Sequence, residues 1–468
     1  MRFRGTLCSE GCMGQDAPRQ VAVIARRQEA TTEILLLSGP DGLSLPIQRQ
    51  SDIAGLHADI ADRFGLVVST LDCIGREPRF FVFESVDGRT AKNGHWFRTK
   101  ELPAISGISA AQRAMLDQWF TESELGGTGR PPWTCFGWYA PAADWATDRL
   151  RAAGFRSNGN PVQAGMRSWS YQLRLPAIPR DLYFKASPPV YGHEAAVSLL
   201  LSERFPKAVP NVLAVDERRG WMLTEDFGGI RHSANPAETV DAYVRMVPEL
   251  ARLQRGMAEQ ADALLATGCP DHRLEILPGL YDALVAEVDG LTVDERRQLV
   301  SLSARFRDHC ARLAGSGVPH TIIHLDIWRG NYTFTDTGPL IFDWAESVLG
   351  HPFVSLDVVL RDVRSVAPSD LAAERQVADA YLREWADISG PVPLDEALQP
   401  ASAPGIVSRA LLWRDALATL RADRALPFAG TVAAQLRELL ILQPHVWVVA
   451  SALVVAAAGS GLATASEV

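Results

Sequence analysis

Two apolar segments that each run into an aspartate constrain the fold of this chain more than any other feature of its sequence. The first covers residues 322–325 and leads to Asp326, and Asn331 follows five residues later. The second covers residues 340–342 and leads to Asp343. Short apolar runs that end in polar residues are typical of buried strands leading into loops. We therefore expect two strands whose loops bring two carboxylates and one amide together.

Phosphoryl transfer gives each of these three polar side chains a role. The reaction leaves little covalent chemistry to the protein, so catalysis consists mainly of positioning and of neutralising charge. One carboxylate orients the acceptor hydroxyl, while an asparagine and a second carboxylate hold Mg²⁺ against the phosphates. The alternative is that Asp326 and Asn331 only form a turn and that Asp343 only ends a strand, and residues upstream argue against it.

These residues, with His324 before them and Trp344 after them, resemble the catalytic signature of the aminoglycoside phosphotransferase and choline kinase-like family, whose members are relatives of the protein kinases. In brief, the signature is His-x-Asp-x4-Asn followed by an apolar residue, Asp and Trp. The resemblance implies that Asp326 is the catalytic aspartate and that Asn331 and Asp343 bind Mg²⁺. It also implies that His324, the other residue of the predicted catalytic set, shapes the loop.

The sequence departs from this signature within the loop. Leu325 stands where many relatives have glycine, and Trp328 and Arg329 stand where His-Pro or a similar pair is common. These positions affect loop shape and acceptor contacts more than the chemistry, so they leave the acceptor open. No Ala-Pro-Glu segment or long activation loop follows Asp343, and this absence favours a small-molecule acceptor over a protein.

A lysine inside an apolar strand is the second informative feature. Lys185 lies in the run of residues 182–186, where an unpaired charge would be costly to bury. In the family, the lysine of this strand reaches the α- and β-phosphates and is held by a glutamate of the following helix, and Glu194 stands at that place. The alternative is an edge lysine whose ammonium reaches water, together with a solvated glutamate.

Two further segments stand where this family contacts the nucleotide. Residues 165–171 precede the lysine strand, and their backbone N–H groups and two serine hydroxyls are candidates to bind phosphate oxygens. The segment is not Gly-x-Gly-x-x-Gly, and an ordinary hairpin explains it equally well. Residues 222–229 resemble the hinge whose backbone reads the purine, so both ATP and GTP stay open. The residues predicted to bind the nucleotide are Lys185, Glu194, Ser168, Ser170, Leu223 and Glu225.

Residues 21–120 resemble a Nudix hydrolase domain, with strands, a Leu-Pro turn, a helix and a late Trp-Phe strand. A Nudix hydrolase needs several carboxylates on one helical face to bind the Mg²⁺ that activates water. The corresponding helix offers only Asp59 and Asp62, and two such residues more often form a solvated stripe. We therefore expect a relic of the domain without hydrolase activity.

The expected fold class of the whole chain is α+β. A Nudix-like α/β domain precedes a bilobal protein-kinase-like domain that has a small β-rich lobe and a large, mainly helical lobe. The expected boundaries are residues 20–122 for the Nudix-like domain, 123–133 for a linker, 134–227 for the small lobe and 228–468 for the helical lobe.

Charge and composition exclude several partners. A net charge of -9 and a pI near 5.6 argue against a nucleic-acid binder, which needs a basic face. The first 19 residues lack the basic and apolar regions of a secretory signal, so we expect a cytoplasmic protein. The apolar part of the C-terminal tail, residues 446–458, is too short to span a membrane. Six scattered cysteines, among them Cys8 and Cys12, indicate neither a disulfide framework nor a zinc site.

Together these features predict a phosphotransferase that moves the γ-phosphate of ATP or GTP, with Mg²⁺, to a hydroxyl of a small metabolite or antibiotic. The alternatives are a nucleotide-binding pseudokinase that regulates a partner and a diphosphate hydrolase acting through the N-terminal domain. The sequence does not identify the acceptor. Three carboxylates of the helical lobe, Glu346, Asp362 and Asp370, mildly favour a cationic one.

Overall fold

The structure is a computed structural model, and it describes residues 20–28, 31–48, 50, 52–75, 78–102, 104–125, 129–229 and 235–442. Two features of the sequence, the Cys8/Cys12 pair and the apolar tail beyond residue 442, lie outside the described residues. The chain forms two compact units, and each is described by itself. The first consists of Met1–Pro189 and Val212–Asp226, and the second of Val190–Asn211 and Phe227–Val468. The domain boundaries drawn from the sequence stay predictions.

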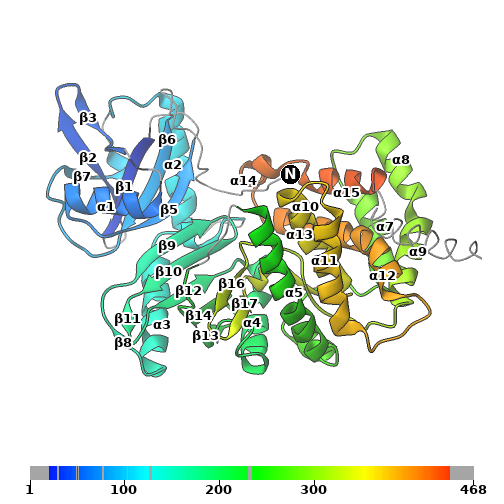
Figure 1. The fold of residues 1–468 in the computed structure, drawn as a ribbon. Helices are drawn as coiled ribbons and strands as arrows, with labels where there is room; N and C mark the ends of the chain where they lie inside the picture. The colour runs from blue at the N-terminus through cyan, green and yellow to red at the C-terminus, as the bar shows by residue number, and fades with distance from the viewer. Residues whose placement is uncertain are drawn as a thin grey trace, which may run out of the picture. The chain divides into compact units, whose positions relative to one another are not determined.

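The N-terminal part of the first unit is built on a seven-stranded sheet (Figure 1). Its main path has the order β3-β2-β1-β6-β5, with β4 added beside β1 and β7 beside β2. The central pair, β1 and β6, is parallel, whereas the other pairs are antiparallel. The strands are β1 (Gln20–Gln28), β2 (Thr31–Gly39), β3 (Gly42–Ser44), β4 (Ile47–Gln48), β5 (Val68–Ile74), β6 (Arg79–Ser85) and β7 (His95–Arg98).

One helix covers each face of this sheet. Helix α1 (Ile53–Phe64) packs Leu56 and Ile60 against one set of strand side chains, and helix α2 (Ala110–Leu125) packs Leu116 against the other set. Successive side chains of a strand point to opposite faces, so the long apolar run of β1 supplies both layers. This part of the chain is therefore a helix-sheet-helix sandwich, in line with the α/β arrangement expected from the sequence.

A second, antiparallel sheet completes the first unit, with the order β13-β14-β12-β10-β9. Helix α3 (Tyr139–Ala152) packs on it through Trp145, whose ring makes edge-on contacts with Phe184 and Trp221 of the sheet. The strands are β9 (Val162–Arg167), β10 (Ser170–Leu175), β12 (Leu182–Ala186), β13 (Val212–Asp216) and β14 (Trp221–Glu225), and a separate pair joins β8 (Arg156–Ser157) to β11 (Ala177–Ile178).

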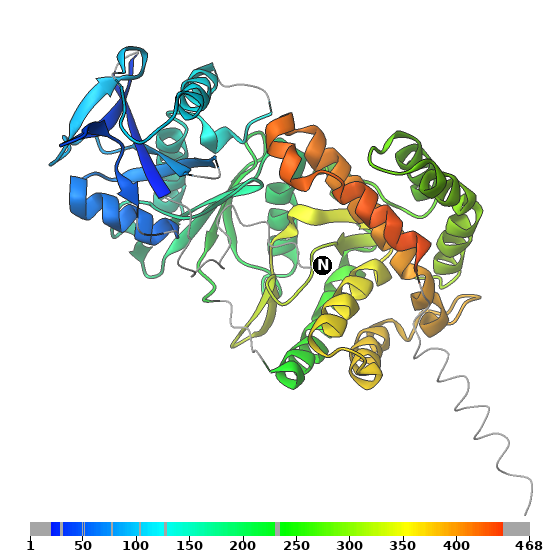
Figure 2. The same cartoon turned by 90° about the horizontal axis from the view of Figure 1, so that it is seen from above.

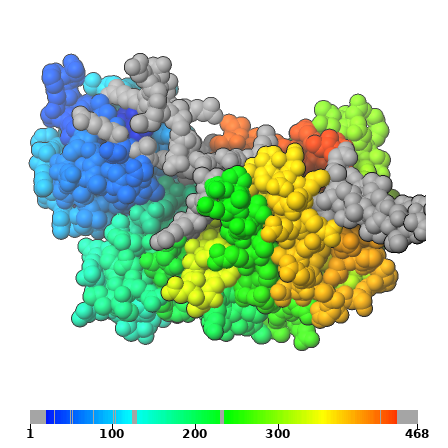
Figure 3. Space-filling model, viewed as in Figure 1, coloured from blue at the N-terminus to red at the C-terminus, as the bar shows by residue number. Residues whose placement is uncertain are grey.

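The second unit is mainly helical, and helix α5 (Pro236–Met257) runs through its core. Ten residues of α5 are buried, which follows from its apolar stripe at helical spacing. Helix α11 (Leu371–Leu382) packs along it (Figure 3), and α13 (Ser402–Ala418) packs along α15 (Thr431–Leu440) (Figure 2). The other helices include α4 (His193–Arg204), α6 (Ala261–Ala266), α7 (Leu277–Glu287), α8 (Val293–Ser301), α9 (Ser303–Ala314), α10 (Phe353–Val366), α12 (Leu394–Leu398) and α14 (Ala422–Ala425).

Two short strand pairs lie within this helical unit. Strand β15 (Thr321–His324) pairs with β18 (Ser347–Gly350), and β16 (Tyr332–Thr335) pairs with β17 (Gly338–Ile341). The two apolar segments singled out in the sequence are thus strands, as expected. Among the described residues, no helix is both long enough and apolar enough to cross a membrane.

Candidate active site

The loop between β15 and β16 carries Asp326 and Asn331, and one amide group closes it. The Asn331 side-chain nitrogen donates to the backbone oxygen of Asp326 at 2.7 Å and to its carboxylate at 2.9 Å. The backbone N–H of Asn331 donates to the Trp328 carbonyl at 2.8 Å, which tightens the turn. Because the amide nitrogen faces Asp326, the amide oxygen of Asn331 points away from that carboxylate, and it has the chemistry of an Mg²⁺ ligand.

His324 joins this loop to the strand that leads to Asp343. Its Nδ1 accepts from the backbone N–H of Asp326 at 3.2 Å, so Nε2 carries the proton and donates to the Phe342 carbonyl at 3.1 Å. The ring is fully buried and lies 4.8 Å from that of Trp344. Both ring nitrogens are engaged with the backbone, so the His324 ring joins the backbone of Asp326 to that of Phe342.

Asp343 adopts a backbone conformation that few residues tolerate. Its φ of 65° lies in the left-handed region, which aspartate enters more easily than most residues. The neighbouring Phe342 N–H donates to the Asn331 carbonyl at 3.0 Å, and the Leu325 N–H donates to the Glu346 carbonyl at 3.0 Å. These backbone bonds hold the two loops together, so the ends of both strands form one site.

The site concentrates negative charge. Burial, followed by the charges of Asp326 and Asp343, raises the pKa of Glu346 to about 8, while the charge of Arg409 acts in the opposite direction. Burial is the main reason why the pKa of the Tyr191 phenol is raised, and the charges of the same three carboxyl groups raise it as well. The repulsion therefore keeps Glu346 largely protonated near neutral pH, and a cation bound at the site would relieve that repulsion.

Two protein side chains are suited to hold that cation. The described residues contain no cluster of three or more His, Cys, Asp or Glu that would bind a metal ion by itself. Mg²⁺ commonly uses only one or two protein ligands, and phosphate oxygens and water complete its octahedron. The amide oxygen of Asn331 and the carboxylate of Asp343 fit this donor set.

Arg329 ties the middle of the loop to two helices. Its guanidinium donates to the Asp362 carboxylate of α10 at 3.2 Å, and the Tyr243 hydroxyl of α5 donates to the same oxygen at 2.6 Å. Asp370 accepts from the Ala373 N–H at 3.0 Å and so caps helix α11. The sequence offered Asp362 and Asp370 as carboxylates for a cationic acceptor, but the structure uses both internally.

Arg409 lies behind the site and was missed in the sequence. Burial lowers its pKa to about 10, while the charges of Asp357, Glu438 and Glu346 act in the opposite direction. Its Nη2 atom lies 3.9 Å from Glu438 and has no hydrogen bond within the described part of the chain. An arginine inside the apolar helix α13 was the available signal, because a buried cation needs nearby carboxylates.

The predicted nucleotide residues are divided between the two units. Lys185 is half-buried in β12, on the opposite side of the strand from buried Phe184, whereas Glu194 is buried at the start of α4. Lys185 belongs to the first unit and Glu194 to the second, so their pairing stays a prediction.

The other four predicted nucleotide residues all lie in the first unit. Ser168 lies in the turn between β9 and β10, and Ser170 begins β10. Leu223 is buried in β14, and Glu225 ends that strand, where its carboxylate lies 3.4 Å from the Arg180 guanidinium. Their contacts with a nucleotide stay predictions.

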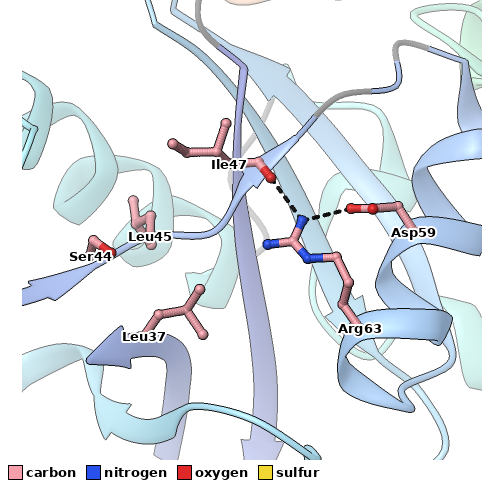
Figure 4. A pocket seen from close by; sticks show the side chains of 6 residues that line it. All are labelled: Leu37, Ser44, Leu45, Ile47, Asp59 and Arg63. Carbon is pink, nitrogen blue, oxygen red and sulfur yellow. Dashed lines mark hydrogen bonds and ion pairs between the residues drawn. The ribbon is translucent and has the colours of Figure 1, made fainter. Parts of the chain in front are cut away.

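A cavity of about 420 Å³ opens in the N-terminal part of the first unit (Figure 4). Arg63 donates to the Asp59 carboxylate and to the Ile47 carbonyl, both at 2.8 Å, and Asp62 is exposed. Asp59 is therefore paired with an arginine of its own helix. The lining residues are Leu37, Ser44, Leu45, Ile47, Asp59 and Arg63.

Comparison with known proteins gives one family match. The model of a family described as the phosphotransferase enzyme family matches residues 158–390. No curated protein matches the chain. The Nudix-like resemblance concerns residues before this match and stays a prediction.

The solved structures to which the chain is similar include several small-molecule kinases. A choline/ethanolamine kinase family protein from Mesorhizobium loti is 19% identical, with a TM-score of 0.42, over 63% of this chain and 95% of its own. An ethanolamine kinase from Plasmodium vivax is 11% identical, with a TM-score of 0.46, over 72% and 95%. An aminoglycoside phosphotransferase from Streptomyces rimosus is 18% identical, with a TM-score of 0.37, over 56% and 96%.

Proposed function

We propose that this chain uses the γ-phosphate of ATP or GTP, together with Mg²⁺, for phosphoryl transfer. Its residues 158–390 belong to the phosphotransferase enzyme family, so the chain is a phosphotransferase with a hydroxyl group of a small molecule as acceptor. The observation that carries this proposal is the joined pair of loops in which Asp326, Asn331 and Asp343 meet. The Asn331 amide contacts the Asp326 carboxylate, and the Asn331 carbonyl accepts a backbone hydrogen bond from Phe342, next to Asp343. A turn or a strand cap alone would need neither contact.

In this proposal Asp326 binds the acceptor hydroxyl and takes up its proton as the phosphoryl group is transferred. The hydrogen bond from Asn331 fixes the carboxylate, and the bond from the Asp326 N–H to His324 fixes the backbone beneath it. A fixed carboxylate lowers the entropic cost of aligning the hydroxyl with the γ-phosphate.

The metal requirement follows from the charges around the loops. Mg²⁺, when bound to Asn331 and Asp343, supplies positive charge to the phosphates and relieves the repulsion among the three carboxyl groups. Lys185, held by Glu194, supplies the second positive charge on the α- and β-phosphates. Ser168 and Ser170 meet phosphate oxygens, and the backbone near Leu223 and Glu225 reads the purine.

The preference for a cationic acceptor is weaker than the sequence indicated. Asp362 is neutralised by Arg329, and Asp370 caps a helix, so neither supports a cationic acceptor. Glu346, with its raised pKa, is the remaining member of that set. Acceptor-stimulated release of ADP or GDP, screened over neutral and cationic hydroxyl compounds, identifies the substrate.

The two alternative functions receive less support. A diphosphate hydrolase needs several free carboxylates on α1, whereas Asp59 is bound to Arg63 and only Asp62 is left on that helix. A pseudokinase typically lacks at least one residue of the catalytic set, whereas Lys185, Glu194, Asp326, Asn331 and Asp343 are all present.

Replacement of the predicted catalytic aspartate tests the proposal. We expect Asp326→Asn to lower kcat by about 10²- to 10⁴-fold, the usual contribution of general acid–base catalysis, and to leave nucleotide affinity nearly unchanged. The measurement is steady-state ADP release with the acceptor found in the screen, together with calorimetric titration of the nucleotide.

Asp336→Asn is the matched control, because Asp336 is exposed in the turn between β16 and β17 and should leave the rate unchanged. If Asp326→Asn transferred phosphate at the parental rate, the assignment of Asp326 would be wrong.

A further inference from the structure

The hairpin formed by β9 and β10 carries the predicted phosphate-binding serines. Side-chain hydrogen bonds attach this hairpin to strand β5 of the N-terminal sheet. Strand β9 is the last strand of its sheet, and β5 is the last strand of the N-terminal sheet. Edge strands present backbone groups that need partners. In this unit the two edges meet, and side chains rather than a backbone ladder connect them.

Gln163 of β9 makes the first connection. Its side-chain oxygen accepts from the Thr70 N–H at 2.7 Å, and its side-chain nitrogen donates to the Thr70 carbonyl at 3.2 Å. One amide thus satisfies both backbone groups of Thr70, as a neighbouring strand would do. Gln163 is 4% exposed, so loss of these bonds would leave polar groups buried without partners.

Tyr171 of β10 makes the second connection. Its hydroxyl lies 2.8 Å from the Ser69 hydroxyl, and both side chains are buried. Burial raises the pKa of the Tyr171 phenol, so it stays protonated and able to donate. Gln163 lies before the turn at Ser168 and Tyr171 lies after it, so each strand of the hairpin is tied to β5.

The segment that connects the two sheets is itself packed. Arg130 is buried and stacks over the Trp119 ring at 4.8 Å, and its guanidinium lies 3.8 Å from the Asp72 carboxylate. The Gly137 N–H donates to the Glu84 carboxylate of β6 at 2.8 Å. The N-terminal sheet and the hairpin sheet therefore form one compact body within the first unit.

We propose that the N-terminal domain serves as a positioning element for the β9–β10 hairpin and thereby sets the affinity for the nucleoside triphosphate. The inference rests on the proposed function, because it assumes that this hairpin covers the phosphates. A free edge hairpin would lose conformational entropy when it closes on a nucleotide. Because Gln163 and Tyr171 hold the hairpin in place before the nucleotide binds, less conformational entropy is lost on nucleotide binding.

This role also accounts for a domain whose helix α1 has only one carboxylate, that of Asp62, besides the paired Asp59. The Ser69 and Thr70 contacts need the fold of the N-terminal sheet but no catalytic residue in it. Gln163, Tyr171, Ser69 and Thr70 are positioning residues, since they act on the hairpin and not on the reacting atoms.

The test removes the hydroxyl pair in the full-length protein. For Ser69→Ala, Tyr171→Phe and the double variant, we expect backbone amides of residues 162–171 to exchange hydrogen about 3- to 10-fold faster without nucleotide, the effect of one lost hydrogen bond. We expect the KM for ATP to rise by a similar factor, while kcat stays within about twofold because the Asp326 loop is untouched.

Tyr281→Phe is the matched control, because it deletes another buried phenol hydrogen bond, to the Leu299 carbonyl in the second unit. It should change neither the exchange of residues 162–171 nor the KM for ATP. Gln163→Met, which keeps the length but not the hydrogen bonds of the side chain, should act more strongly than Tyr171→Phe.

Unchanged hairpin exchange in the double variant would overturn the proposal, as would a uniform rise in exchange over the whole first unit. Faster hairpin exchange with an unchanged KM for ATP would also overturn the proposal, because the order of the hairpin would then have no effect on nucleotide affinity. The exchange measurement needs no substrate. If the parental protein transferred no phosphate, the proposed function would fail while the tie between domain and hairpin would still be measured.

Discussion

At the scale of single residues, the position of the Trp328 ring in the loop between β15 and β16 depends on one glycine. A Cβ atom at Gly330 would lie 2.2 Å from the indole of Trp328, so the ring occupies the space that any other residue would need. Trp328 is 41% exposed, and its ring stands at a position that the family resemblance links to the acceptor. Gly330 therefore determines where this aromatic surface lies.

We expect Gly330→Ala to displace the Trp328 ring and to raise the KM for the acceptor several-fold, with little effect on the KM for ATP. Because the far end of an exposed indole can move, the free energy of unfolding should fall by less than about 1 kcal/mol. Steady-state kinetics and thermal unfolding measure the two effects.

Gly279→Ala is the control, because Gly279 is exposed in helix α7 and its added Cβ meets no atom. It should leave the kinetics unchanged and raise stability by roughly 0.4–1 kcal/mol. An unchanged acceptor KM in Gly330→Ala would remove Trp328 from the acceptor site.

At the scale of elements, the loop, α5 and α10 share one carboxylate. Asp362 accepts from Arg329 and from Tyr243, and these three residues come from three separate elements. The strands and the loop between them are encoded by neighbouring residues in the sequence. The contacts that attach this loop to the two helices form only when the helices pack against it. Asp362 therefore has a structural role that its position in the sequence does not reveal.

We expect Asp362→Asn to lower kcat by about tenfold, because a hydrogen bond to a charged group is worth about 1.5–3 kcal/mol and its loss frees Arg329 and the loop. The KM for the acceptor should change little. The measurement is the separation of kcat from KM with the acceptor found in the screen.

Asp370→Asn provides the comparison, since asparagine caps a helix as well as aspartate does. A large rise in acceptor KM at constant kcat in Asp362→Asn would instead indicate that Asp362 binds a cationic acceptor directly.

At the scale of the whole molecule, the N-terminal domain and the family domain overlap in one compact unit. The match begins at residue 158, yet the contacts that hold Gln163 and Tyr171 come from residues 69 and 70. Glu84 adds a contact that depends on pH. Burial raises its pKa to about 7, and the hydrogen bond from Gly137 opposes this shift.

Because the pKa of Glu84 is higher in the folded protein than its ordinary value of 4.5, the folded state holds a proton that the unfolded chain releases. The contribution of Glu84 to stability is thus fully present below about pH 4.5 and declines as pH rises to about 7. We expect Glu84→Gln to flatten this decline in thermal unfolding midpoints measured from pH 5 to 8.

Asp117→Asn, at an exposed position on α2, should keep the parental pH dependence. A Glu84→Gln variant with the parental slope would show that another group titrates in this range.

Much of the fold followed from local patterns. Strand β12 begins and ends with the apolar run of residues 182–186 that was singled out in the sequence. The proposed catalytic segment is also local, because Asp326, Asn331 and Asp343 lie within eighteen residues and short strands bring their loops together.

The sequence by itself therefore determined the reaction class and the residues proposed to carry it, since local spacing places them on adjacent loops. Only the tertiary structure decided which other groups surround them. Asp362 lies 33 residues from its partner Arg329 in the sequence. Gln163 lies 93 residues from Thr70, and Tyr171 lies 102 residues from Ser69. No local periodicity records such contacts, because they arise when separate elements pack and buried polar groups find partners. For that reason the use of Asp362 and the tie between the N-terminal sheet and the hairpin became visible only in the folded chain.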